Sequence, residues 1–175
     1  MNVKCPYCGY ENIAGSDHCQ KCLHSFTQKD IPQPSKEKFQ KKLMTEKVSD
    51  FISKVPPIIL KPDDSVQTMI DQMQAFPTKG CVLICGPDKK LLGIASIRDV
   101  VLKVAGVIKE PSKIPVKNIM TPKPECLDKN APLSFALNKM SIGKFRHVPV
   151  LDNGIPIGVV STRDLIEYLT TKKKK

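Results

Sequence analysis

The sequence predicts an α+β protein with two similar halves, preceded by a small metal-binding module. Two observations carry this prediction. The segment Gly93 to Asp99, Gly-Ile-Ala-Ser-Ile-Arg-Asp, recurs 65 residues later at Gly158 to Asp164 as Gly-Val-Val-Ser-Thr-Arg-Asp. In addition, residues 1–28 contain two Cys-x-x-Cys pairs. Because repetition at a fixed period is typical of a duplicated folding unit, we expect two units of one architecture after the cysteine-rich segment.

The cysteine spacing predicts a closed zinc site in residues 1–28. Its four ligands would be Cys5, Cys8, Cys19 and Cys22, with ten residues between the two pairs. Four thiolates suit the tetrahedral coordination of structural Zn²⁺, and metal binding would stabilise a segment too short to fold by apolar burial. An iron centre of rubredoxin type and a pair of disulfides stay open as alternatives.

The cysteine-rich segment resembles the short zinc ribbons at the ends of many bacterial and archaeal proteins, including Gly9, Asn12 and Gly15 at positions that shape the turns. The resemblance implies no single function, because ribbons bind nucleic acid, bind proteins or only fold. His18 and His24 lie beside the ligands, but four cysteines complete the coordination, so we expect both histidines to be exposed.

Residues 29–47 are expected to link the ribbon to the repeats. Pro32 and Pro34 disfavour regular pairing, and residues 35–44 suit a short polar helix. We expect Phe39 and Leu43 of that helix to contact the first repeat, and the ribbon to be loosely tethered.

The two repeats are predicted at residues 48–110 and 111–171, each with the order β-α-β-β-α. Val48–Ile52 and Val116–Met120 open the two copies, followed by short apolar segments after Pro57 and Pro124. Apolar residues with i, i+4, i+7 spacing then predict one helix in each copy. They are Val66, Ile70 and Met73 in the first copy and Leu133, Leu137 and Met140 in the second.

A hairpin and a second helix complete each copy. Two β-forming runs flank a turn, namely 81–85 and 91–95 around 86–90, and 148–151 and 155–160 around 152–154. The final helix begins near Arg98 or Arg163. It carries Val101, Leu102 and Ala105 in the first copy, and Leu165, Ile166 and Leu169 in the second.

The repeated motif G-x-x-S-x-x-D has a structural and a functional interpretation. A serine followed three residues later by an acid is a capping box, which places Ser96 or Ser161 at the N-cap and Asp99 or Asp164 in the first turn. Free amides and a hydroxyl at a helix start also suit a phosphate, and an adjacent carboxylate can accept both hydroxyls of a ribose. A nucleotide would satisfy both groups.

With this motif present twice, residues 48 to about 170 resemble a tandem pair of CBS domains, also called a Bateman module. The resemblance implies units packed through their sheets about a pseudo-twofold axis, with clefts that bind AMP, ADP, ATP or S-adenosylmethionine. It implies that Asp99 and Asp164 hold ribose hydroxyls, and that Ser96 and Ser161 contact ribose or phosphate. It also implies a homodimer, because stand-alone pairs commonly form discs of two copies.

Basic residues near the motif distinguish the two copies. Arg98 and Arg163, inside the motif, either reach a phosphate or are exposed without a role. Arg146 and His147 precede the second-copy strand, where the family often has phosphate-binding side chains, whereas the first copy has Lys79-Gly80. We therefore predict clefts of unequal affinity, with the better one using Arg146 and His147. The alternative for His147 is a partly buried structural role.

The sequence thus predicts a regulatory protein that senses an adenosine-containing small molecule and signals to an unidentified protein partner. We expect no enzymatic activity, because the chain has no Walker loop, nucleophile elbow or paired carboxylates. Cys81, Cys85 and Cys126 are expected in the core. The alternative is a nucleic-acid-binding protein that uses the ribbon and the basic tail, residues 172–175, with the repeats as a dimerisation module.

Charge and hydropathy bound these alternatives. The net charge of +11 favours acidic partners, but it is dispersed apart from the four terminal lysines, and the ribbon has few basic residues. No segment is apolar enough to span a bilayer, and no signal peptide precedes the cysteines. We therefore expect a cytoplasmic protein without membrane contact.

Overall fold

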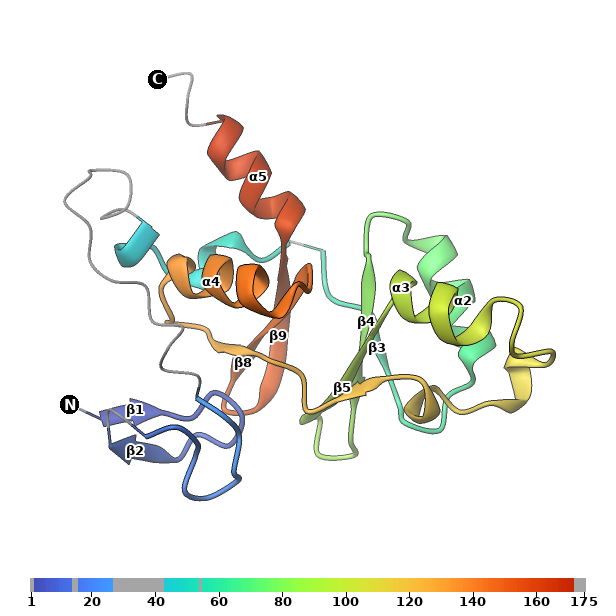
Figure 1. Ribbon diagram of the computed structural model, residues 1–175, viewed down its shortest axis with the longest axis horizontal. Coiled ribbons are helices and arrows are strands. Elements are labelled where there is room, and N and C mark those ends of the chain that lie inside the picture. The colour runs from blue at the N-terminus through green and yellow to red at the C-terminus, as the bar shows by residue number, and fades with distance from the viewer. Residues whose placement is uncertain (1, 14–15, 27–42, 54, 172–175) are drawn as a thin grey trace. The chain divides into compact units, whose positions relative to one another are not determined.

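The computed structural model describes residues 2–13, 16–26, 43–53 and 55–171 (Figure 1). The chain divides into two compact units. The first-copy unit is Pro56–Pro124, and the second-copy unit combines Met1–Val55 with Glu125–Lys175. Both contain a sheet and helices, so the predicted α+β class is confirmed. None of the helices in the described ranges is both long and apolar enough to cross a membrane.

The ribbon is a two-stranded hairpin. Strands β1 (Asn2–Lys4) and β2 (Glu11–Ile13) pair antiparallel, and Gly9 in the connecting loop has a φ of +73°. Glycine adopts this left-handed conformation without the steric cost of a side chain. Most of the predicted polar helix at 35–44, including Phe39, lies outside the described residues. Leu43 is described, and it belongs to the core of the second-copy unit, a cluster that also contains Val48 from the opening segment of the first repeat.

The first-copy unit contains a four-stranded sheet in the order β3-β4-β5-β6. Strand β3 pairs parallel with β4, and the other neighbours are antiparallel. The strands are β3 (Ile59–Leu60), β4 (Cys81–Cys85), β5 (Leu91–Ser96) and β6 (Thr121–Pro122). The helical segments are α2 (Val66–Ala75), α3 (Ile97–Asp99), a π turn η3 (Val100–Val104), and 3-10 turns η4 (Pro111–Lys113) and η5 (Val116–Asn118).

The second-copy unit repeats this order with a three-stranded sheet, β7-β8-β9. Strand β7 pairs parallel with β8, and β8 pairs antiparallel with β9. The elements are the 3-10 turn η2 (Val48–Phe51), β7 (Leu127–Asp128), α4 (Leu133–Gly143), β8 (His147–Asp152), β9 (Ile155–Ser161) and α5 (Thr162–Thr171). The predicted β-α-β-β-α order is therefore confirmed in both copies.

Each unit has its own apolar core, formed where a helix covers the sheet. Every residue of β4 is buried, and α2 contributes Val66, Met69 and Met73. In the second-copy unit, Leu133 and Met140 of α4 are buried in the same way. The three cysteines outside the ribbon are core residues, as predicted, with exposed fractions of 6% for Cys81, 6% for Cys85 and 1% for Cys126.

The opening segment of each copy packs in the core of the other copy's unit. Val48 of η2 belongs to the core beneath β8 and β9, and its N–H donates to the carbonyl of Ala131 at 2.8 Å. Val116 of η5 belongs to the core beneath β4 and β5, and its N–H donates to the carbonyl of Asp64 at 2.7 Å. The compact units therefore divide the chain at different residues from the sequence repeat, whose bounds of 48–110 and 111–171 stay a prediction.

This exchange explains the glycine of the repeated motif. A Cβ on Gly93 would lie 2.3 Å from the sulfur of Met120, and a Cβ on Gly158 would lie 2.8 Å from Cβ of Ile52. Met120 and Ile52 are the final residues of the two opening segments. The motif glycine thus leaves room for the opening segment on the strand that carries it.

The final helices of the two copies differ. In the first copy, the chain after Asp99 forms a π turn in which the N–H of Ala105 donates to the carbonyl of Val100 at 2.9 Å. Since a π turn shifts which residues face inward, Val104 is buried while Val101 and Leu102 are 59% and 68% exposed. In the second copy, α5 is a regular helix of ten residues.

Candidate functional site

Each repeated motif ends in a serine and an aspartate joined across the start of a helix. In the second copy, Oδ2 of Asp164 accepts hydrogen bonds from the N–H of Ser161 at 2.7 Å and from its hydroxyl at 2.6 Å. In the first copy, Oδ2 of Asp99 accepts from the same groups of Ser96, both at 2.8 Å. We call these pairs the second corner and the first corner. The serine-to-aspartate contact expected of a capping box is present in both.

The first corner contains a cation. Nζ of Lys103 lies 2.7 Å from Oδ1 of Asp99, and it also donates to the carbonyl of Ile119 at 2.6 Å. Burial alone would raise the pKa of Asp99, but the hydrogen bonds from Lys103 and Ser96 outweigh it and lower that pKa below its usual range. Both carboxylate oxygens of the first corner are therefore occupied by groups of the protein.

The second corner has no such cation within the described ranges. The position four residues after Asp164 is Tyr168, whose hydroxyl donates to the carboxylate of Glu46. The Tyr168 ring packs edge-on against Phe51, with ring centroids 4.8 Å apart. No hydrogen bond or ion pair from the described part of the chain reaches Oδ1 of Asp164. The sequence shows that the first copy has a lysine at this position, but only the structure shows that this lysine contacts Asp99.

A histidine lies opposite the second corner. His147 opens β8 and is the cross-strand partner of Ser161 in β9. Burial is the main cause that lowers the pKa of His147; Arg146 adds to the effect and the Asp164 carboxylate opposes it. Three of the predicted residues, Ser161, Asp164 and His147, are thus brought together.

The three predicted arginines are all exposed. Arg146 and Arg163 are exposed in the second-copy unit, and Arg98 is exposed in the first-copy unit. At the first corner, the cross-strand partner of Ser96 is the buried thiol of Cys81 in place of an imidazole. The two corners therefore differ both in the cation held by the aspartate and in the side chain opposite the serine.

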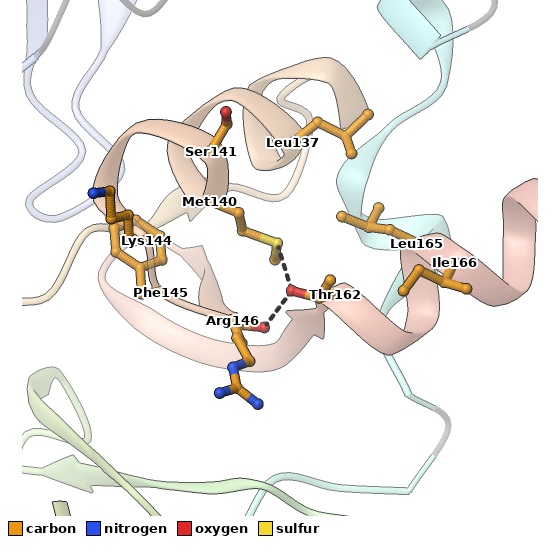
Figure 2. A pocket seen from close by; sticks show the side chains of 9 residues that line it. All are labelled: Leu137, Met140, Ser141, Lys144, Phe145, Arg146, Thr162, Leu165 and Ile166. Carbon is orange, nitrogen blue, oxygen red and sulfur yellow. Dashed lines mark hydrogen bonds between the residues drawn. The ribbon is translucent and has the colours of Figure 1, made fainter. Parts of the chain in front are cut away.

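A pocket of about 340 Å³ lies between α4 and α5, beside the second corner (Figure 2). Thr162 places its hydroxyl 3.5 Å from both the sulfur of Met140 and the carbonyl oxygen of Arg146. The guanidinium of Arg146 points away from Met140 in Figure 2. Neither Ser161 nor Asp164 lines this pocket. The only signal of this pocket in the sequence is indirect: the apolar residues predicted for the two helices include Leu137 and Met140 of α4, and Leu165 and Ile166 of α5.

The four predicted metal ligands lie together in the ribbon. Their sulfurs are all within 4.8 Å of one another, with 3.6 Å between Cys5 and Cys22 and 3.5 Å between Cys8 and Cys19. Zinc–sulfur bonds of roughly 2.3 Å in a tetrahedron place sulfurs about 3.8 Å apart. All four are free thiols, so the arrangement suits one tetrahedral ion.

The sulfur of Cys19, one of the predicted metal ligands, accepts hydrogen bonds from neighbouring groups. The buried amide of Asn12 donates to the Cys19 sulfur at 3.7 Å, and the N–H of Lys21 lies 3.4 Å from it. Burial would raise the pKa of Cys19, but hydrogen bonds, led by the N–H groups of Cys22 and Lys21, lower it to about 6. Oδ1 of Asn12 accepts from the N–H of Gln20 at 2.9 Å, which fixes the amide. The predicted turn-shaping role of Asn12 is confirmed.

The ribbon contacts the rest of the second-copy unit, which corrects two expectations. His18 is exposed as predicted, but His24 is half-buried, because its ring stacks on Tyr7 with centroids 5.4 Å apart and its Nε2 lies 3.9 Å from the sulfur of Cys126. Nζ of Lys4 also donates to Oδ1 of Asn153 at 3.0 Å. The loose tether was therefore wrong for the described residues.

Comparison with known proteins identifies the repeats. Residues 48–106 and 116–171 match the family model of the CBS domain. The chain belongs to the CBS-domain family. The predicted CBS pair is thereby confirmed, and the ribbon lies outside both matched segments.

The relatives agree with this assignment. The CBS domain-containing protein CBSCBSPB1 of Arabidopsis thaliana is 29% identical over 127 residues, which cover 72% of this chain but 23% of that protein. The CBS domain pair of protein MJ0100, in complex with 5′-methylthioadenosine and S-adenosyl-L-methionine, has a TM-score of 0.64 at 24% identity, covering 73% of this chain and 98% of that one. CBSX2 in complex with AMP has a TM-score of 0.61 at 22% identity, with the same coverage. These two structures share the fold.

Proposed function

We propose that the chain is a regulatory protein whose CBS pair binds an adenosine-containing ligand and transmits binding to a protein partner. The second corner is the observation that carries this proposal. It combines a carboxylate oxygen, Oδ1 of Asp164, to which no described group donates, with a serine hydroxyl and the imidazole of His147. The adenosine ligands held by the MJ0100 pair and by CBSX2 support the ligand class.

The chemistry of the second corner suits a nucleotide or nucleoside. Ionised Asp164 accepts hydrogen bonds only, so it is matched to the donor hydroxyls of a ribose. The first amides of α5 and the cations of Arg146 and Arg163 would favour a phosphate or another anion. In this proposal the protein acts by binding, without catalysing a reaction.

Binding regulates a partner only if the ligand prefers one conformation or assembly of the protein over another. We propose, from the family resemblance, that the responding assembly is a homodimer. The ligand and the partner would then be coupled through the equilibrium between assemblies, and each would change the affinity of the other by the same factor.

Isothermal titration of the full chain with AMP, ADP, ATP and S-adenosylmethionine tests the proposal. Asp164→Asn keeps the shape of the corner and an oxygen to accept from Ser161, but it removes the charge. We expect it to lower affinity about tenfold or more, because hydrogen bonds to charged groups contribute roughly 1.5–3 kcal/mol. Asp71→Asn, at an exposed position on α2, is the matched control and should bind normally. Wild-type protein that binds none of the four ligands would contradict the proposal.

We further propose that Cys5, Cys8, Cys19 and Cys22 hold one structural Zn²⁺. The sulfur separations and the free thiols support a single ion with four protein ligands, which leaves no open coordination position for catalysis. Elemental mass spectrometry should find one zinc per chain, lost in Cys8→Ser with Cys22→Ser. Iron at one per chain would replace this assignment by a rubredoxin-type centre.

Nucleic-acid binding by the ribbon and the lysine tail has less support. Of the few basic residues in the ribbon, Lys4 is already hydrogen-bonded to Asn153. Electrophoretic retardation of RNA or DNA at low salt, abolished by deletion of residues 172–175, would favour this alternative. Absence of retardation at low salt would exclude it.

A further inference from the structure

We propose that Lys103 lowers the affinity of the first corner for ribose-containing ligands, so that the second corner is the principal site. This inference rests on the proposed nucleotide binding and names the residue that separates the two copies of the motif. The motif itself cannot separate them, because Gly, Ser, Arg and Asp occupy equivalent positions in both.

The first step is the occupancy of the Asp99 carboxylate. Oδ2 accepts from the N–H and the hydroxyl of Ser96, and Oδ1 is paired with the ammonium of Lys103 at 2.7 Å. The two hydroxyls of a ribose diol are donors that need carboxylate lone pairs. A ribose would therefore compete directly with the ammonium group for Oδ1.

The second step is that Lys103 is held at two points. Its ammonium also donates to the carbonyl of Ile119 at 2.6 Å, and Ile119 is only 4% exposed. Moving the lysine away from Asp99 strains this second bond or leaves a shielded carbonyl without that donor, which is costly. The side chain of Asp99 is 15% exposed, so water replaces the lost partner poorly.

The third step is the second copy, where the same position cannot supply a cation. Tyr168 occupies it, and the Tyr168 hydroxyl is bonded to Glu46 while its ring packs on Phe51. The cations near the second corner are the exposed Arg146 and Arg163, whose charges help to lower the pKa of His147. The two corners therefore present opposite conditions to a ribose: one carboxylate is neutralised internally and the other is not.

The opposite role for Lys103 is a phosphate ligand that strengthens binding at the first corner. The two roles predict opposite signs for one substitution. Removal of the charge should raise affinity if the lysine competes with the ribose, and lower it if the lysine holds the phosphate.

The test isolates the first corner in an Asp164→Asn background and titrates AMP into the full-length protein. We expect Lys103→Met in that background to bind AMP about twofold to fivefold more tightly than Asp164→Asn alone, which is the range expected for removing one competing ion pair. Lys103→Arg keeps the cation and should leave affinity unchanged. Adding Asp99→Asn to the Lys103→Met variant should abolish the gain, which locates it at the first corner.

A second measurement does not depend on ligand. Carbon-13 NMR should show the pKa of Asp99 rising in Lys103→Met and staying low in Lys103→Arg, because the ammonium group helps to lower it. An unchanged Asp99 titration, or unchanged or weaker AMP binding in Lys103→Met, would overturn this inference while wild-type binding at the second corner still supports the proposed function. Absence of AMP binding in wild type and every variant would overturn both.

Discussion

The first and second copies carry the same seven-residue motif in different surroundings. In the first copy, Lys103 neutralises Asp99 and a buried cysteine faces the serine. In the second, a tyrosine takes the place of the lysine, and His147 faces the serine. The motif sets the backbone and the helix cap, whereas residues outside it decide which charges a ligand would meet. A repeated motif therefore predicts that the fold is repeated, but it does not by itself predict two equal binding sites.

The ribbon adds a further difference between the copies. Its contacts through Lys4 and His24 go to Asn153 and Cys126 of the second-copy unit. The metal state of the ribbon should therefore affect Cys126 and leave the buried cysteines of the first-copy unit unchanged.

Removal of the metal should have the largest effect. Because metal binding supplies about 10–16 kcal/mol to short zinc modules, a chelator should unfold the ribbon and uncover Cys126. Alkylation of Cys126, followed by peptide mass spectrometry, should accelerate on chelation and slow again when zinc is restored. Cys81 and Cys85 are the internal controls and should label at an unchanged rate. Equal acceleration at all three cysteines, or none at Cys126 after proven zinc loss, would contradict the difference between the copies.

Substitution of the motif glycines should have the next largest effect. Gly158→Ala brings a methyl group against the branched Cβ of Ile52, whereas Gly93→Ala meets mainly the flexible end of Met120. We expect Gly158→Ala to lower the free energy of unfolding by about 1–3 kcal/mol, as overpacking does, and Gly93→Ala by less. Urea denaturation measures both.

A second substitution sharpens the glycine comparison. Ile52→Ala removes the side-chain atoms that crowd Gly158, so the double variant should lose less stability than the sum of the single variants. Additive losses would mean that Ile52 does not limit the space at this glycine. A Gly93→Ala protein that is less stable than Gly158→Ala would reverse the predicted order.

The smallest effect should be on pH dependence. The folded-state pKa of His147 is lowered chiefly by burial, so the unfolded chain takes up a proton first as the pH falls through 6.5. The free energy of unfolding should therefore decrease below that pH, and this decrease should be smaller in His147→Gln. We expect the difference to be smaller than the free energy of unfolding lost in Gly158→Ala. Thermal unfolding between pH 5 and 7.5 measures it. Burial also lowers the pKa of His24, so His24→Gln is the matched control that measures the contribution of the ribbon histidine to the same decrease. An unchanged pH profile in His147→Gln would show that His147 is not responsible.

Local patterns were sufficient for most of the secondary structure. A run of β-forming residues placed β4 at Cys81–Cys85, and turn residues placed the tight turn at Asn153 and Gly154, both of which have positive φ angles. Spacing alone grouped the four ribbon cysteines, and the serine-to-aspartate interval predicted both helix caps. These features depend on residues close in sequence, so they are determined before the chain is compact.

Long-range packing decided the rest. The sequence determined the elements, the four-cysteine cluster and the two corners. Only the tertiary structure placed each opening segment in the other copy's core, bonded Lys103 to the carbonyl of Ile119, and buried His24 against Cys126. The reason is physical: a periodic pattern records which face of an element avoids water, but not which distant segment covers that face. The charge that a ligand would meet at each aspartate depends on which distant segment packs there.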